Sequence, residues 1–136
     1  MSAAQAAGHD PGVHPPAPPE TAVTVCTVSF HNAPHLRLNW ALADALNREE
    51  AQIYWVVAEN TPPYSDDRLD PGDQRFKVIE GVGPEHSPNF QHTLALHKCF
   101  DFVTTRFLLV LDPDFYIVRP NWVRTVTEHM QRHASE

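Results

Sequence analysis

The sequence predicts an α/β fold in three layers, with a mostly parallel sheet between helices that cover both of its faces. Two observations support this prediction. Four short runs of β-branched and apolar residues alternate with longer segments in which apolar residues recur at helical spacing. Neighbouring parallel strands need long right-handed crossovers, and helices commonly supply them. An open, largely parallel sheet is therefore the expected architecture.

The first two strands and the helix between them form the start of this pattern. TAVTVCTVSF, residues 21–30, is mostly apolar and β-branched, as expected of a central strand that is covered on both faces. Pro34 then opens a helix, and QIYWVVA after it forms a second strand that ends at Glu59-Asn60. The helical face expected to cover the sheet has spacing i, i+3, i+4, i+7 and i+8: Leu38, Ala41, Leu42, Ala45 and Leu46.

The second half of the chain continues the alternation after a long polar loop, TPPYSDDRLDPGDQ. FKVIEGVG predicts a short third strand, and a helix is expected from about Pro88 to Val103. Its apolar stripes are Leu96-Phe100-Val103 and Ala95-Cys99-Phe102. RFLLVLD predicts the fourth strand, FYIV a short further one, and NWVRTVTEHMQRH a last helix capped by Asn121. The resulting order, β-α-β-β-α-β-(β)-α, is Rossmann-like.

Length and composition indicate one folded domain with a tail. The chain has 136 residues, and five of its thirteen prolines fall in positions 11–19, which carry no periodic apolar pattern. We expect residues 1–20 to be a disordered proline-rich tail and residues 21–136 to be the domain. Cys26 and Cys99 each lie within an apolar pattern and are expected to be buried hydrophobes.

Charge and hydropathy exclude some functions. The formal net charge is −7 and the ten Lys and Arg are scattered, so nucleic acid is not expected as a partner. The first residues lack the positive region and the continuous apolar segment of a secretory signal, and no apolar run reaches 18 residues. We therefore expect a cytoplasmic protein with no transmembrane segment.

Polar side chains follow three of the predicted strands where each strand ends. These exits are Ser29-Phe30-His31-Asn32, Glu59-Asn60 and Asp112-Pro113-Asp114. Ligands of open α/β sheets bind beyond the carboxyl ends of the strands, so the three exits are the candidate site.

The two carboxylates of the third exit are candidate metal ligands. Pro113 favours an extended Asp112, which would place the side chains of Asp112 and Asp114 on the same side. Such oxygen ligands suit Mg²⁺ or Mn²⁺, which complete their shell with water and substrate phosphates. The alternative interpretation is a solvated turn that merely ends a strand.

Three segments resemble a known family in its order: VSFHN, VVAEN and TRFLLVLDPDFYIVRPNWV. They are similar to the nucleotide-binding half of glycosyltransferases with the GT-A fold, particularly the family 2-like group, whose third exit carries an Asp-X-Asp motif. The resemblance covers about Ala22 to Arg132. It implies binding of a nucleoside diphosphate sugar, UDP- or GDP-linked, together with Mn²⁺ or Mg²⁺.

The resemblance also implies roles for individual residues. Ser29 and Phe30 would lie against the base, and Glu59 would accept a hydrogen bond from it. Asp112 would lie at the ribose and the metal, and Asp114 would be the principal metal ligand.

Two histidines are further candidate nucleotide contacts. His92 lies at the start of a helix that approaches the sugar nucleotide in the family. His31 borders the first exit, where it could touch phosphate or lie in solvent. Phe30 and His31 depart from the Tyr and Asn usual in the family.

The resemblance implies transfer of a sugar to an acceptor, but the acceptor half and the catalytic base of these enzymes follow the Asp-X-Asp segment. Only residues 115–136 follow Asp114, so the fold is expected to be truncated there and the catalytic base is unknown. A partner subunit or a homodimer could supply the acceptor site. Alternatively, the chain is a non-catalytic or remnant module that binds a nucleotide sugar without transferring it.

Three other interpretations fit the sequence less well. His92 and His97 are five residues apart, about 140° round a helix, and lack the partner at i+4 that a helical zinc site uses. Gly81-X-Gly83 lacks the third glycine of a dinucleotide fingerprint. Haloacid-dehalogenase-like phosphatases place their Asp-X-Asp after the first strand, with essential residues far downstream. Here the motif follows the fourth predicted strand, and few residues come after it.

Overall fold

The computed structural model describes residues 17–47 and 52–134, which form a parallel sheet and three helices. In chain order these are β1 (Val23–Ser29), α1 (Ala33–Leu46), β2 (Ile53–Glu59), β3 (Lys77–Glu80), α2 (Pro88–Phe100), β4 (Phe107–Val110) and α3 (Trp122–His133). The strands pair in the order β3-β2-β1-β4, and every pairing is parallel. The predicted α/β class and the four strands are confirmed. Most of the predicted tail lies outside the described residues.

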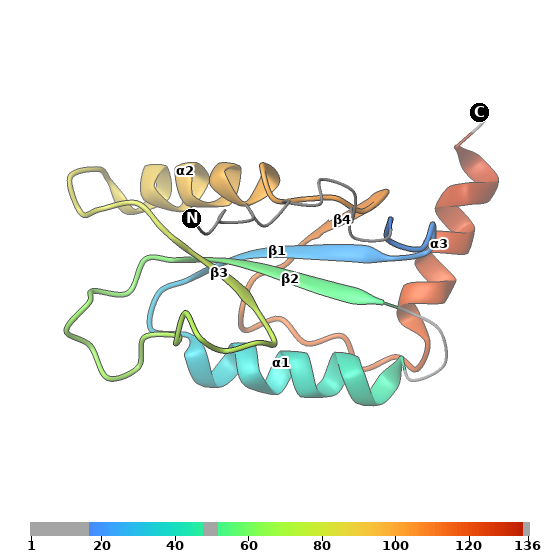
Figure 1. Ribbon diagram of the computed structural model, residues 1–136, viewed down its shortest axis with the longest axis horizontal. Helices are drawn as coiled ribbons and strands as arrows, with labels where there is room; N and C mark the ends of the chain where they lie inside the picture. The colour runs from blue at the N-terminus through green and yellow to red at the C-terminus, as the bar shows by residue number, and fades with distance from the viewer. Residues whose placement is uncertain (1–16, 48–51, 135–136) are drawn as a thin grey trace, which may run out of the picture.

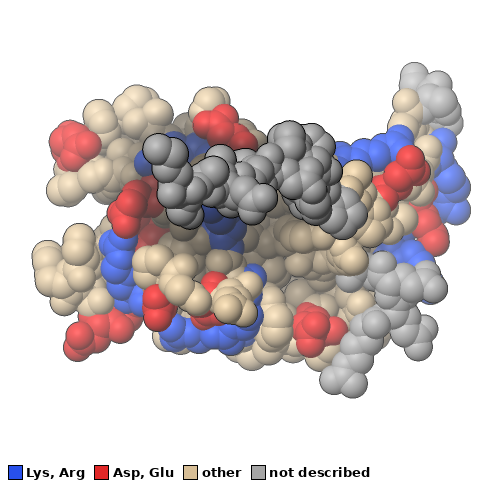
Figure 2. Space-filling view, in the orientation of Figure 1, with Lys and Arg blue, Asp and Glu red and all other residues tan. Residues whose placement is uncertain are grey.

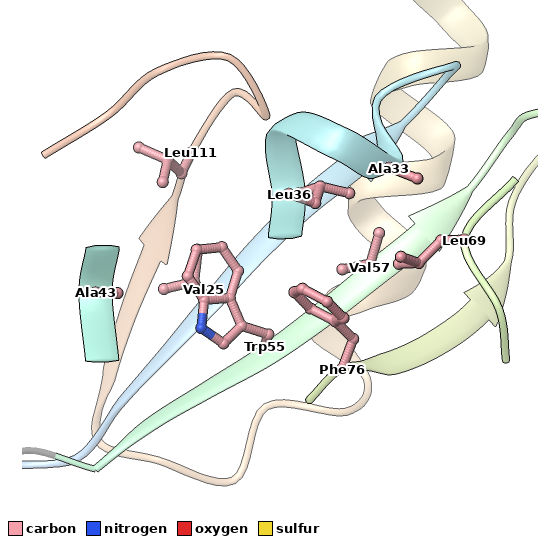
Figure 3. Close-up of a cluster of buried hydrophobic side chains, with 9 residues drawn as sticks. All are labelled: Val25, Ala33, Leu36, Ala43, Trp55, Val57, Leu69, Phe76 and Leu111. Carbon is pink, nitrogen blue, oxygen red and sulfur yellow. The ribbon is translucent and has the colours of Figure 1, made fainter. Parts of the chain in front are cut away.

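Helices α1 and α2 lie on opposite faces of the sheet (Figure 1). Because side chains alternate along a strand, β1 and β2 feed two cores. Val25, Trp55 and Val57 face Leu36 of α1 in the cluster drawn in Figure 3. On the other face, Cys26 and Val56 pack with residues of α2. Helix α3 lies at the end of the sheet where β1 begins, and there Trp122 and Val123 pack against Val23 and Phe107.

The predicted face of α1 is wrong. Leu38 is 51% exposed, and Ala41 and Ala45 are exposed, while Leu42 and Leu46 are half-buried. The buried residues are Ala33, Leu36, Asn39 and Ala43. An asparagine can lie on this face because its Nδ2 donates hydrogen bonds to the carbonyl oxygens of Pro113 and Phe115, at 3.0 and 2.9 Å. A pattern of apolar residues alone cannot identify such a position.

The predicted stripes of α2 are correct in part. Ala95 and Cys99 are buried, and Leu96 and Val103 pack beside them. Phe100 and Phe102 are 39% and 44% exposed. Helix α2 ends at Phe100, so Phe102 lies beyond the helix, and the buried side of α2 packs on β1 and β2. FYIV forms no strand, since residues 115–118 leave the sheet as an irregular segment.

Asn121 occupies the predicted cap position of α3, but its side chain does not cap the helix. Asn121 has φ 54°, in the left-handed region, and its side chain makes no capping hydrogen bond. Instead, the Val123 N–H donates to Oδ1 of Asn47, which directly follows α1, at 3.1 Å. The Asn121 N–H donates to the Leu46 carbonyl at 2.8 Å. The end of α1 therefore holds the start of α3 in place.

The described residues contain no helix long and apolar enough to cross a membrane. On the face shown in Figure 2, Lys and Arg lie among acidic residues and form no continuous basic surface.

Candidate functional site

The three predicted exits lie at one edge of the sheet, because all four strands are parallel. This is the edge that carries the long loop of residues 60–76, on the left in Figure 1. This loop, which follows β2, packs Leu69 into the core on the α1 face. The loop after β3 leads instead to α2 on the opposite face. Loops that leave neighbouring strands towards opposite faces open a crevice between them, where ligands of such sheets bind.

A crevice of about 390 Å³ lies at this point. Phe30 lines it from the end of β1, and Asn60, Tyr64 and Arg68 line it from the loop after β2. The loop after β3 and Gln91 of α2 complete the lining. The Phe30 side chain is 57% exposed, so its ring can be reached by a ligand. Two of the predicted site residues, Phe30 and Glu59, line this crevice.

Glu59 has a structural role that sequence reasoning did not identify. Its side chain is only 2% exposed. One carboxylate oxygen accepts the Thr61 N–H and the other accepts the Leu69 N–H, both at 2.8 Å. The carboxylate therefore closes the loop from residue 60 to residue 69 over the end of β2. Contact between Glu59 and a base stays a prediction.

Asn60 fixes the opposite wall of the crevice. Its Oδ1 accepts the Val82 N–H at 2.7 Å, and the Gly81 N–H donates to the Glu59 carbonyl at 3.0 Å. This close approach explains the glycine, because a Cβ at residue 81 would overlap Asn60 Oδ1 and lie 2.7 Å from the Glu59 carbonyl oxygen. The Nδ2 of Asn60 makes no hydrogen bond among the described residues, which leaves an amide donor for a ligand.

His31 is held towards the loop after β2. It has φ 58°, its N–H donates to Thr61 Oγ1 at 2.9 Å, and its Nδ1 lies 2.8 Å from both carboxylate oxygens of Asp67. Ser65 also donates to Asp67. The hydrogen bond from Ser65, followed by that from His31, lowers the pKa of the Asp67 carboxyl below its usual range. These contacts fix the orientation of the imidazole beside the Phe30 ring.

Ser29 and His92 occupy very different environments. Ser29 is fully buried, and its Oγ has no hydrogen-bond partner among the described residues. A ligand in the crevice would therefore meet Phe30 before Ser29. His92 is exposed on α2, next to Gln91, which lines the crevice.

Asp112 and Asp114 lie in a turn that follows β4, and both acids are exposed. The Phe115 N–H donates to the Asp112 carbonyl at 3.0 Å, and Pro113 is buried between the two exposed acids. Asn39 of α1 fixes this turn through the carbonyls of Pro113 and Phe115. In the part of the chain that the structure describes, no group of three or more His, Cys, Asp or Glu side chains is arranged to hold a metal ion. A cation at this pair would need water and substrate phosphates as further ligands.

Arg68 is a crevice residue that sequence reasoning missed. Its guanidinium donates to the Thr61 carbonyl and, at 2.7 Å, to Glu80 Oε1. Only 16% of the Arg68 side chain is exposed, whereas Glu80 is 78% exposed. The signal in the sequence is a single arginine within the acidic segment SDDRLD.

The structure is an open parallel α/β domain with a crevice at the carboxyl edge of its sheet, which is the position where ligands of such sheets bind. No family model, curated protein or solved structure matches this chain.

Proposed function

We propose that the chain is the donor-binding domain of a glycosyltransferase with a GT-A-type three-layer fold, which binds a nucleoside diphosphate sugar for transfer to an acceptor. The observation that carries the proposal is the crevice beyond β1 and β2, with the exposed Phe30 ring and the Asn60 amide on its walls. An aromatic ring provides a surface for a base, and an amide can donate to it.

The dimensions of the sheet support a site that extends from the crevice to the acid pair. β1 lies between β2 and β4 in the sheet, so the exits at Asn60 and Asp112 are two strand spacings apart. That separation is roughly 10 Å across the sheet. A nucleoside with its base against Phe30 could reach the Asp112–Asp114 turn with its diphosphate.

The acid pair would then hold the diphosphate through a divalent cation. Both carboxylates are exposed, so Mn²⁺ or Mg²⁺ could bind them and keep positions open for water and phosphate oxygens. In glycosyl transfer such a cation stabilises the negative charge that develops on the departing diphosphate. We assign no general base and no acceptor contacts to the described residues; a partner subunit or a homodimer could provide them.

Calorimetry tests the donor site directly. UDP and GDP are titrated into the protein with and without Mn²⁺, and we expect heat of binding for at least one of them that depends on the metal. Asp114→Ala should abolish the metal-dependent part, whereas Asp44→Ala, which removes an exposed carboxylate of α1, should bind as wild type. Absence of binding in wild type, or metal-dependent binding that survives in Asp114→Ala, would contradict the proposal.

A module that binds without transfer is the second candidate. In this proposal Asn60 and Phe30 of the crevice and the acid pair would all contact the donor, and no described residue is assigned to an acceptor. The two candidates are separated by incubating UDP- and GDP-linked sugars with Mn²⁺ and a panel of hydroxyl acceptors, from simple sugars to a protein extract, and following release of the nucleoside diphosphate as the sugar moves to an acceptor or to water. Release that requires Asp114 indicates a transferase, whereas binding without release indicates the module.

A further inference from the structure

The outer edge of β2 is only partly covered. β2 pairs with β1 along all seven of its residues, from Ile53 to Glu59, but β3 pairs with β2 only from Val56 onwards. The first three residues of β2, Ile53, Tyr54 and Trp55, therefore have no strand partner on their outer edge among the described residues. An uncovered strand edge presents backbone N–H and C=O groups that an extended peptide can pair with.

A cavity of about 650 Å³ lies along this uncovered edge. Trp40 and Phe76 line it on the α1 side of the sheet, and Phe102 lines it from the segment after α2. Tyr54 and Phe102 are 43% and 44% exposed, so apolar contact surface is available beside the strand edge. The cavity lies beside the N-terminal half of β2, whereas the crevice proposed for the donor lies beyond the C-terminal end of the strand.

Two cations border the cavity, and they differ in their partners. Arg75 is bound by both carboxylate oxygens of Asp73, at 2.8 and 2.5 Å, and its guanidinium lies over the Trp40 and Phe76 rings. Lys77 lies with its Nζ 5.3 Å from the centre of the Phe102 ring. Among the described residues Lys77 has no carboxylate partner, so its charge is available to a ligand.

We propose that this edge, defined by Ile53–Trp55 and Lys77, binds an extended acidic peptide segment of a partner protein as an additional strand. The backbone of the segment would pair with β2, in the place that β3 leaves open. One of its carboxylates would meet Lys77. Although the whole chain carries a net charge of −7, the group at the strand edge is a lysine that no described carboxylate neutralises, and this local cation favours an acidic segment over a basic one.

A carbohydrate fits this cavity less well than a peptide. Trp55 and Phe76 are 4% and 5% exposed, so their faces are packed in the core and cannot serve as stacking surfaces for a sugar ring. The available groups are a strand edge, two half-exposed rings and a cation, which together match the backbone and side chains of a β-strand. The proposal does not depend on the donor site.

Synthetic peptides test the proposal on the full chain. The probe is a fluorescein-labelled hexapeptide of alternating valine and glutamate, and binding is followed by fluorescence anisotropy and by amide chemical shifts. We expect saturable binding that shifts the amides of residues 53–55 and 77 and weakens as salt is added. A hexapeptide of alternating valine and lysine should bind about tenfold more weakly, because its charge opposes Lys77.

Two controls identify the cause of binding. The valine–glutamate peptide with an N-methyl group on every residue keeps its side chains but cannot donate along either edge, so its binding should be lost. Lys77→Glu should weaken binding of the unmodified peptide by about tenfold. Arg124→Glu makes the same charge change on α3, where the arginine is 57% exposed, and should leave binding unchanged.

Three results would overturn the proposal. One is the absence of any binding at millimolar peptide, which would mean that Lys77 only protects the edge from association. Another is equal binding of the N-methylated peptide, which would exclude strand pairing. The third is a shift of the same amides by a linear glucose oligosaccharide while the acidic peptide causes none, which would assign the cavity to carbohydrate.

Discussion

Replacing Glu59 with Gln tests whether this buried carboxylate holds the loop after β2. The carboxylate accepts two backbone N–H groups, from Thr61 and Leu69, and it is 2% exposed. A Gln side chain has one carbonyl oxygen and one NH₂ group, so it can accept only one of these N–H groups. The other N–H would face the NH₂ and remain buried without an acceptor.

The magnitude follows from these two contacts. The retained hydrogen bond changes from a charged to a neutral acceptor, which costs about 1 kcal/mol, and the orphaned N–H costs about 1–3 kcal/mol. We therefore expect the free energy of unfolding to fall by about 2–4 kcal/mol. For a chain of this size that corresponds to a decrease in Tm of about 10 °C.

Urea unfolding followed by circular dichroism measures the change. Glu80→Gln is the matched control, because Glu80 is 78% exposed and its pairing with Arg68 should contribute less than about 1 kcal/mol. If Glu59→Gln unfolds within about 0.5 kcal/mol of wild type, the two hydrogen bonds do not stabilise the loop and the reasoning fails. Nucleotide titration of the same variant separates a structural role from a base contact: a folded variant that loses binding supports the contact.

Three further substitutions test other contacts at the two ends of the sheet. Asn47→Ala should lower the free energy of unfolding by about 1–2 kcal/mol, because it removes the side chain that caps α3. Asn121→Gly is the control and should change the free energy of unfolding by less than about 0.5 kcal/mol, because glycine readily adopts the φ of 54° and the Asn121 side chain makes no capping bond. Urea unfolding compares the two variants. Gly81→Ala should destabilise the protein and weaken nucleotide binding, because the new Cβ would overlap Asn60 Oδ1 and the Glu59 carbonyl oxygen. Gly83→Ala is the control and should be tolerated, because its new Cβ would meet only the movable end of the Glu85 side chain. Thermal unfolding measures the stability of both variants, and calorimetry measures their nucleotide binding. Ser65→Ala should raise the pKa of Asp67, as measured by carboxyl ¹³C titration, and an unchanged pKa would contradict the assigned cause. The Asp67 carboxyl has a lowered pKa in the folded state, so its stabilisation is present above the usual carboxyl pKa of about 4 and is lost as the pH falls below that value.

The strands were predictable because each is a run of β-branched and apolar residues that no other element accommodates as well. The edge of the sheet at which the candidate site lies was also predictable, because parallel strands all end at the same edge. The buried face of α1 was not predictable, because Asn39 lies at its centre and its two acceptors are 74 and 76 residues further along the chain. Asn47 is a similar case, since it caps a helix that begins at Trp122.

Buried polar residues thus determine the geometry at both ends of the sheet. Glu59 closes the loop after β2, Asn39 holds the turn after β4, and Asn47 joins α1 to α3. Each of these side chains lies in or beside a helix or strand and hydrogen-bonds to the backbone of another segment. These bonds fix the conformation of the segment more tightly than its own turn residues would. Because Asn39 bonds the carbonyls on either side of Asp114, the position of this candidate metal ligand depends on α1 as much as on β4. A rigid turn of this kind is what a two-carboxylate cation site needs, since water and phosphate must supply its remaining ligands.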